Sequence, residues 1–460
     1  MPREDHVAGP GRPPMITVEA VPVTPRARVY AEGWQSWSPT TWYRSGDAPH
    51  RPTETRQHLM RFRPGAPVPE AGVQGEGLLV IDPGDGAPAR VFGTLDAATD
   101  VPSIRAVWHG DRIEVAATGV VQAWVAESGG AGSRDGDGDG DDDGPDGAAG
   151  TAALAGFGER MAVAAAARRG SPDLRVWCTW YRYFESVTAA DVRENLNAID
   201  RHRLPVDVVQ IDDGWSTGTG EWTRIRPGFG ALADTIAAIR DSGRRAGLWL
   251  APFTVGAASD LARRHPDWLT GAAGANWGDR LVGLDLTHPG VRAYLADLFA
   301  RVRELGVDYL KLDFLYGGAV PAPRFDDTAT GVAAYRSGLA LIREVMGEDV
   351  YLLGCGAPIL PSVGLVDAMR VSPDTFHEGG EDGSQGLRGR MSLRARAWQH
   401  GVLWVNDPDC LVARPGFALR EEWAREVRAA PGLRGFSDRI DELDARGLHL
   451  VRRLLEGAPA

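Results

Sequence analysis

Between residues 172 and 456 the chain alternates short apolar runs with amphipathic stretches of helical period, and the alternation repeats eight times. Apolar strands buried on both faces, with helices between them, are typical of a parallel sheet. Eight such units in about 250 residues or somewhat more match a (β/α)8 TIM barrel. An open doubly wound sheet is the alternative, but no G-x-G-x-x-G turn follows the first strand. The expected strands lie at 175–184, 206–215, 245–253, 308–316, 350–358, 366–374, 402–409 and 432–436.

The first third of the chain has a different pattern. Residues 15–127 contain apolar or alternating runs, such as RVYAEGW, GLLVID and RIEVAAT, separated by Gly, Pro and Asp turns. This pattern predicts a small antiparallel β-sandwich. Residues 1–14 are rich in Pro and Gly, and we expect them to be disordered. The predicted fold class is therefore α/β, a TIM barrel (172–456) preceded by a β-sandwich domain.

Residues 128–150 form a low-complexity segment with seven Asp. Four of them, Asp135, Asp137, Asp139 and Asp146, have the spacing of ligands in a calcium-binding loop. A solvated acidic linker is the alternative and needs no ligand. We favour the linker, because we expect no helix beside the segment, whereas an EF-hand has one on each side.

Composition excludes several functions. Asp and Glu number 62 against 50 Lys and Arg, and a net charge of −12 argues against nucleic acid as a partner. No apolar run reaches the ~20 residues of a membrane helix, and the first residues lack the apolar core of an export signal. We therefore expect a cytoplasmic protein with no membrane partner. The three cysteines are too far apart for a disulfide framework or a metal cluster, and we expect neither metal nor cofactor.

Charged and aromatic residues gather at the ends of the expected strands. The active site of a TIM barrel lies at the carboxyl ends of its strands, and burying such charges is costly without pairing or a function. Carboxylates from different strands, with cations beside them and Trp around them, suit cleavage of a glycosidic bond. The strand ends carry Trp180, Tyr181, Tyr183, Asp212, Asp213, Trp215, Trp249, Lys311, Asp313, Tyr316, Cys355, Arg370, Ser372, Asp374, Asn406, Asp407 and Asp409, and no His.

Lys311 is the single lysine among the 50 basic residues. A position that keeps Lys where every other cation is Arg indicates a need for a compact charge. In a strand, residues two apart share a face, so we expect Lys311 to lie beside Asp313 and to keep it ionised. The same alternation places Arg370 and Asp374 on one face.

Four motifs resemble glycoside hydrolase family 36, the α-galactosidase family, which shares a clan with family 27. They are K-x-D at Lys311–Asp313, R-x-S-x-D at Arg370–Asp374, I-D-D-G-W at 211–215 and E-G-W-Q-S-W-S at 32–38. The resemblance covers most of residues 30–125 and 172–456. It implies a retaining exo-α-glycosidase that removes terminal α-D-galactosyl residues from oligosaccharides or glycosides, with Asp313 as nucleophile and Asp374 as acid/base.

The resemblance also implies a set of sugar-binding residues. Asp212 and Asp213 would bind O4 and O6 of galactose, Lys311 the O3/O4 side and Arg370 the O2/O3 side, while Trp180 would wall the pocket. We add Trp215, at the end of the same strand as Asp212, and Cys355 to the candidates. Around Cys355 the sequence G-C-G-A-P departs from the family's glycine-rich segment, and a buried strand cysteine is the alternative.

Several alternatives stay open. The enzyme could instead be an α-N-acetylgalactosaminidase or another α-glycosidase of the same clan. A metal-dependent TIM-barrel enzyme would use Asp212, Asp213, Asp313 and Asp407 as ligands, and an inactive carbohydrate-binding paralogue would need no catalytic pair. Trp34 and Trp37 either cover the barrel mouth or pack the sandwich on the barrel, and we favour packing. The oligomeric state is left open.

Overall fold

The computed structural model describes residues 14–47, 58–66, 68–126, 148–276, 278–376 and 386–457. Residues 1–13 and most of the acidic segment (127–147) lie outside the described residues. The expected N-terminal disorder and the choice between a linker and a calcium loop therefore concern residues that are not described.

The N-terminal domain is an antiparallel β-sandwich, as predicted. One sheet has the order β1-β8-β7-β4 and the other β3-β2-β5-β6-β9. Val29 and Ile81 from the second sheet meet Ile113 and Val115 from the first in a common core. The strands are β1 (Ile16–Pro22), β2 (Arg28–Ala31), β3 (Thr41–Tyr43), β4 (Val73–Glu76), β5 (Leu78–Asp82), β6 (Arg90–Gly93), β7 (Ser103–Trp108), β8 (Arg112–Ala117) and β9 (Gln122–Val125).

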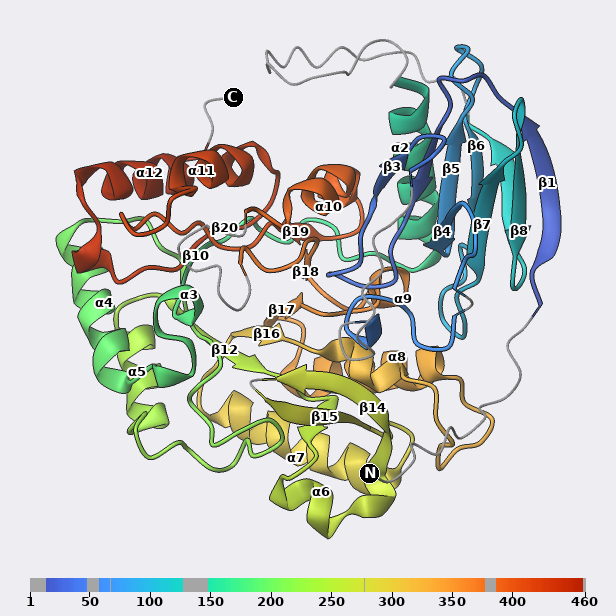
Figure 1. Cartoon of the computed structure of the whole chain (residues 1–460). Helices are drawn as coiled ribbons and strands as arrows, with labels where there is room; N and C mark the ends of the chain where they lie inside the picture. Colours follow the sequence, from blue (N-terminus) through green and yellow to red (C-terminus); the bar gives the residue numbers. More distant parts are fainter. Residues whose placement is uncertain are drawn as a thin grey trace.

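The C-terminal domain is the expected eight-stranded parallel barrel, with the order β19-β18-β17-β16-β12-β11-β10-β20 (Figure 1). The ends of this order approach each other where the amide of Leu433 donates to the carbonyl of Asn406 at 2.9 Å. The strands are shorter than predicted, because the polar residues at their ends already belong to loops. They are β10 (Arg175–Cys178), β11 (Val208–Ile211), β12 (Arg245–Leu250), β16 (Tyr309–Leu312), β17 (Tyr351–Gly354), β18 (Ala368–Arg370), β19 (Val405–Asp407) and β20 (Arg434–Phe436).

The helices between these strands form the outer layer of the barrel. Helix α4 begins after Thr188, whose hydroxyl accepts from the Asp191 amide in a capping box. The fifth unit is reduced, since only the four-residue α9 (Ile359–Ser362) follows β17. The others are α3 (Trp180–Tyr183), α4 (Ala189–Arg201), α5 (Leu232–Asp241), α6 (Asp260–Arg264), α7 (Pro289–Glu304), α8 (Gly331–Met346), α10 (Arg390–Ala395), α11 (Arg420–Ala429) and α12 (Ala445–Leu455).

The expectation that no helix flanks the acidic segment is wrong. Helix α2 (Ala148–Ala164) includes residues 148–150, which we had assigned to the linker. Its composition is rich in Ala, the strongest helix former, and its buried side is apolar. Phe157 of α2 packs against Trp124 of β9 and Trp398 of the barrel, with ring centroids 6.3 and 6.1 Å apart. Helix α2 therefore lies between the two domains (Figure 1).

A three-stranded antiparallel sheet between β12 and α7 was not predicted. Its order is β13-β15-β14, from β13 (Thr254–Gly256), β14 (Leu269–Asn276) and β15 (Asp279–Leu284). Gly and Ala in β14 give little apolar alternation, which is why the pattern did not reveal it. Figure 1 shows β14 and β15 at the front, below the barrel strands and above α6 in this view.

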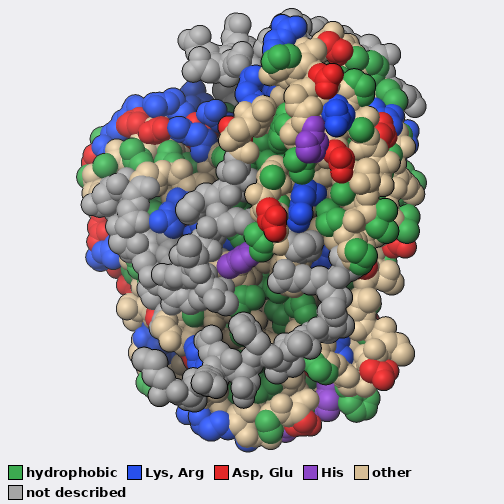
Figure 2. All heavy atoms as spheres, turned by 45° about the vertical axis from the view of Figure 1, so that its right-hand side comes forward, with side chains coloured by type: hydrophobic (Ala, Val, Ile, Leu, Met, Phe, Trp, Pro, Cys, Tyr) green, Lys and Arg blue, Asp and Glu red, His purple; other side chains and the backbone are tan. Residues whose placement is uncertain are grey.

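The outer surface mixes both signs of charge. On the face shown in Figure 2, Arg side chains are interspersed with Asp and Glu. Helices α11 and α12, for example, are joined by the ion pairs Arg420–Asp444 and Arg446–Glu421. Within the described residues, no helix is long and apolar enough to cross a membrane.

Candidate active site

A cavity of about 140 Å³ opens at the carboxyl ends of the barrel strands. An engineered cavity of about 150 Å³ holds benzene, so the space suits one six-membered ring. Its inner end is polar and its sides are largely aromatic. The lining residues are Trp37, Met60, Arg61, Trp180, Phe184, Asp212, Asp213, Trp249, Ala275, Asn276, Lys311, Asp313, Phe314, Pro373, Asp374, Phe376 and Arg388.

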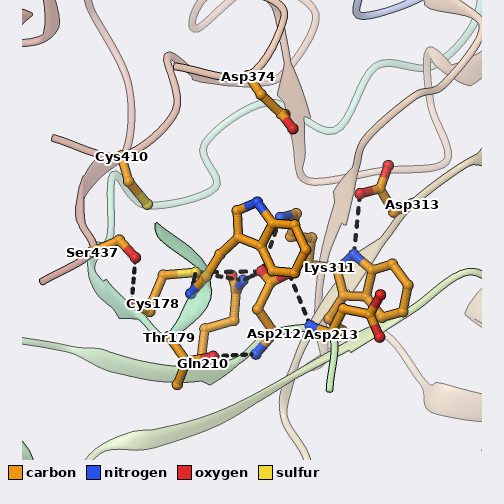
Figure 3. A network of polar contacts seen from close by, with 12 residues as sticks. Cys178, Thr179, Gln210, Asp212, Asp213, Lys311, Asp313, Asp374, Cys410 and Ser437 are labelled. Atoms are coloured by element: carbon orange, nitrogen blue, oxygen red, sulfur yellow. Dashed lines mark hydrogen bonds and ion pairs between the residues drawn. The ribbon is translucent and has the colours of Figure 1, made fainter. Parts of the chain in front are cut away.

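The two predicted catalytic carboxylates both line this cavity. Figure 3 shows Asp313 and Asp374 extending from two separate segments of the barrel, near the network around Lys311 and Asp212. Asp313 accepts from Trp249 Nε1 at 3.1 Å and from the Phe314 amide at 2.8 Å. Asp374 accepts from Arg370 Nη1 at 3.0 Å. Asp313 is 7% exposed and the Asp374 side chain 37%, so one carboxylate is held in the wall and the other stands nearer the opening.

Lys311 binds Asp212, not Asp313. Its Nζ lies 2.9 Å from Asp212 Oδ2. Lys311 and Asp313 both line the cavity, as the strand alternation predicts, but the direct ion-pair partner of Lys311 is Asp212. Burial by itself lowers the pKa of Lys311, but the nearby Asp212 carboxylate raises it well above its usual value. Lys311 is therefore a protonated donor at the inner end of the cavity.

Asp212 is held in one orientation by several donors (Figure 3). Gln210 Nε2 donates to its Oδ2 at 2.5 Å, and the Cys178 thiol donates to the same oxygen at 3.3 Å. The Asp212 amide donates to Thr179 Oγ1 at 2.9 Å. This carboxylate is thus fixed on the floor of the cavity beside Lys311.

Asp213 is a buried carboxylate whose pKa is raised. Burial raises its pKa to about 7, with further upward contributions from Glu185 and Asp212, while a hydrogen bond from Asn276 opposes the shift. The Asn276 amide nitrogen lies 3.1 Å from Asp213 Oδ2. Asn276 ends β14, so the sheet that the sequence did not reveal also contributes a polar group to the cavity. The only sequence feature that could have pointed to Asn276 is the scarcity of this residue type, because the chain has four Asn in total.

We expect Asp213→Asn to raise the melting temperature at pH 8. In the folded state this carboxyl has a pKa of about 7, well above its usual value near ~4. Its contribution to stability therefore falls as pH rises from ~4 through 7, because the folded state must then hold a buried charge. The neutral amide avoids this cost, so the gain should shrink toward pH 5. Thermal melts of both proteins across this range test it, and an equal gain at every pH would contradict it.

Three sequence-predicted residues lie outside the set of described residues that line the cavity. Arg370 lies behind Asp374 and also binds Asp407 at 2.9 Å and Asp409 at 2.8 Å. Cys355 is fully buried, and burial raises the pKa of its thiol. Trp215 donates from Nε1 to the carbonyl of Trp249. The structure thus brings together Trp180, Asp212, Asp213, Lys311, Asp313 and Asp374, and places Arg370, Cys355 and Trp215 behind the wall.

The four carboxylates of the metal-enzyme alternative do not converge on one point. Two of the four are already paired with a cation, since Asp407 binds Arg370 and Asp212 binds Lys311. Among the residues that the structure describes, no group of three or more His, Cys, Asp or Glu side chains could hold a metal ion.

The sandwich domain supplies one wall of the cavity. Trp34 is buried, as the packing interpretation requires, whereas Trp37 lines the cavity and also packs edge-on against Phe314 with ring centroids 5.4 Å apart. Met60 and Arg61, from the segment between β3 and β4, lie on the same side. Sequence reasoning missed both, because no pattern marks a loop residue that crosses to another domain.

The segment 32–38 is fastened to the barrel by buried polar contacts. Arg396, fully buried, pairs with Glu32 at 2.7 Å and donates to the carbonyls of Ser36 and Gln35 at 2.9 and 3.1 Å. Gln399 donates to the second Glu32 oxygen at 2.9 Å. The position of Trp37 therefore depends on residues of the barrel.

Comparisons with known proteins agree with this architecture. Residues 177–347 match the Melibiase family model. The chain is 30% identical over 149 residues to a bifunctional alpha-galactosidase/sucrose kinase of Mediterraneibacter gnavus. It is 26% identical over 136 residues to a myogenesis-regulating glycosidase of Mus musculus. These segments span 30% and 28% of this chain, and only 15% and 19% of those two proteins.

Solved structures extend the likeness to almost the whole chain. An alpha-galactosidase from Thermus thermophilus, in complex with p-nitrophenyl alpha-D-galactopyranoside, has a TM-score of 0.74 and 28% identity over 96% of this chain and 89% of its own. A GH36 alpha-galactosidase from Geobacillus stearothermophilus, at 13% identity and a TM-score of 0.60 over 95% of this chain and 61% of its own, shares the fold. The barrel and the cavity agree with these similarities. The chain has the fold of these alpha-galactosidases, and its match to the Melibiase family model lies within the barrel.

Proposed function

We propose that the protein is a retaining exo-α-galactosidase of glycoside hydrolase family 36. The observation that carries the proposal is the pair Asp313 and Asp374, which line one cavity of single-ring size at the ends of β16 and β18. The floor formed by Asp212, Asp213 and Lys311 offers acceptors and a donor for the hydroxyls of a terminal sugar. The motifs at these residues and the similarity to the Thermus thermophilus structure support the same activity.

In the proposed mechanism Asp313 attacks the anomeric carbon while Asp374 gives its proton to the departing glycosidic oxygen. The bond from Asp313 to the sugar replaces the bond to the leaving group, which departs as an alcohol. Asp374 then takes a proton from a water molecule, whose oxygen displaces Asp313 and releases the sugar. Two inversions at the anomeric carbon give net retention.

The geometry suits each group to its role. Asp313 must be an ionised nucleophile at a fixed position, and the Trp249 indole and the Phe314 amide hold both of its oxygens. Asp374 must exchange protons with a leaving group and with water, and it is the more exposed of the two. Arg370, shared by three carboxylates, acts as a positioning residue for Asp374.

A panel of p-nitrophenyl glycosides tests the proposal. We expect hydrolysis of the α-D-galactoside, with the α-anomer of galactose as the first product seen by NMR, and much slower hydrolysis of the α-glucoside and the β-galactoside. Preference for the α-N-acetylgalactosaminide would make that sugar the substrate. Loss of activity in EDTA would favour the metal-dependent alternative, and no turnover of any glycoside would favour a carbohydrate-binding paralogue.

A further inference from the structure

Two arginines, Arg61 and Arg388, line the otherwise acidic and aromatic cavity. Arg61 is half-buried and Arg388 is exposed, whereas Asp212 at the inner end is almost fully buried. The two guanidinium groups therefore lie toward the opening, where the group attached to the terminal sugar would lie. The inner cation, Lys311, is already paired with Asp212.

The main chain at Arg61 is held in place from the sandwich side. The Gln35 amide donates to the carbonyl of Met60, and the Ser38 hydroxyl donates to the carbonyl of Arg61. On the other side Met60 packs against Gly274 of β14, where a Cβ would lie only 2.5 Å from Met60 Cγ. Arg61 therefore does not project from a freely moving loop.

The guanidinium of Arg61 has no hydrogen bond or ion pair with another described residue. Burial lowers its pKa, and the neighbouring positive charge of Arg388 lowers it further. Both effects make this charge unfavourable in the unliganded protein. An anion bound at Arg61 offsets both, and a carboxylate matches the two-pronged geometry of a guanidinium.

We propose that the outer part of the cavity is a leaving-group subsite that selects aglycones bearing a carboxylate, with Arg61 as its main binding residue. The leaving group departs on the side of Asp374, which donates the proton. Arg388 lies on that side, because its neighbour Gly389 packs against the residues just before Asp374. A Cβ at Gly389 would lie 3.2 Å from Ser372 Oγ and 3.3 Å from the carbonyl oxygen of Pro373. The inference rests on the proposed function and narrows its substrate class to acidic α-galactosides.

The test compares 4-carboxyphenyl and 4-carbamoylphenyl α-D-galactopyranoside, which have nearly the same shape and differ in charge. In the wild type we expect kcat/KM for the acid to exceed that for the amide by about tenfold, as one charge-assisted hydrogen bond allows. Arg61→Gln should bring this ratio close to one, and Arg61→Lys should retain part of it. Added salt should lower the wild-type ratio, because the contact is close to solvent.

Arg301→Gln is the matched control, since Arg301 is exposed on α7 and pairs only with Asp297 among the described residues. It should leave the ratio unchanged. A wild-type ratio near one, or a ratio that Arg61→Gln does not alter, overturns the inference while leaving the α-galactosidase activity standing. If the wild type cleaves neither compound, the proposed function has failed. Calorimetric binding of both compounds to Asp313→Asn then decides the inference, and equal affinities overturn it.

Discussion

Replacement of Asp313 by Asn should lower kcat/KM for p-nitrophenyl α-D-galactoside by at least about 10⁴-fold, on the scale seen when a catalytic nucleophile is removed. The amide keeps the size of the side chain and can accept a hydrogen bond from either Trp249 or Phe314, but not from both, and it cannot form the glycosyl-enzyme bond. Folding should be preserved, because the substitution removes a largely buried charge. Steady-state kinetics and thermal melts on the same preparation measure both effects.

Azide separates the roles of the two carboxylates. In Asp313→Gly, azide entering the vacated space should attack the anomeric carbon once and give the β-galactosyl azide. In Asp374→Ala, the nucleophile still acts first, so azide attacks the glycosyl-enzyme and should give the α-galactosyl azide from an activated aryl substrate. Asp297→Asn, exposed on α7, should behave as wild type. The opposite anomers in the two variants would reverse the assignment, and full activity of Asp313→Asn would reject it.

Replacement of Glu32 by Gln should lower the free energy of unfolding by about 3–5 kcal/mol, the cost of leaving one partner of a buried ion pair unpaired. Glu32 and Arg396 are both fully buried, and they join the sandwich to the barrel. The same variant should also raise KM, because Trp37 in the cavity wall belongs to the segment 32–38, which Arg396 holds in place. Urea denaturation and steady-state kinetics provide the two readouts.

The double variant Glu32→Gln/Arg396→Met distinguishes the unpaired charge from a loss of packing. It should recover part of the stability lost in Glu32→Gln, since no buried charge remains without a counterion. Arg301→Gln, which breaks an exposed pair on α7, should change stability by less than about 1 kcal/mol. If Glu32→Gln is no more harmful than this exposed control, the buried pair does not fasten the domains together.

The barrel could be predicted because its strands are buried on both faces and appear as apolar runs at regular intervals. The β-sandwich followed from alternation and turn residues in the same way. Strand ends then placed Asp212, Asp213, Lys311, Asp313 and Asp374 at one edge, and all five line the cavity. The predicted roles of these residues are untested and remain predictions.

How deeply each site side chain is buried, and which other residues it binds, could not be predicted in this way. Periodicity gives the face on which a side chain lies, but not its neighbours on other strands. Lys311 extends from β16 past β12 to Asp212 after β11, a contact that no spacing along one strand reveals. Arg370 lies on the predicted face but behind the wall, because Asp407 and Asp409 from the next unit hold it. Arg61 and Asn276 come from loops and an inserted sheet, which carry no periodic signal.

The clamp on residues 32–38 has a consequence for the order in which this protein acquires its structure during synthesis. Glu32 leaves the ribosome early, but its partners Arg396 and Gln399 are translated 364 and 367 residues later. Until then the Glu32 carboxylate, which is buried in the folded protein, has no counterion. The segment after β2 must therefore stay hydrated and cannot yet pack in its final position. The wall that carries Trp37 and Arg61 can therefore settle only after most of the barrel has emerged. A nascent chain arrested before residue 396 would contain Asp313 and Asp374 and still lack a finished pocket.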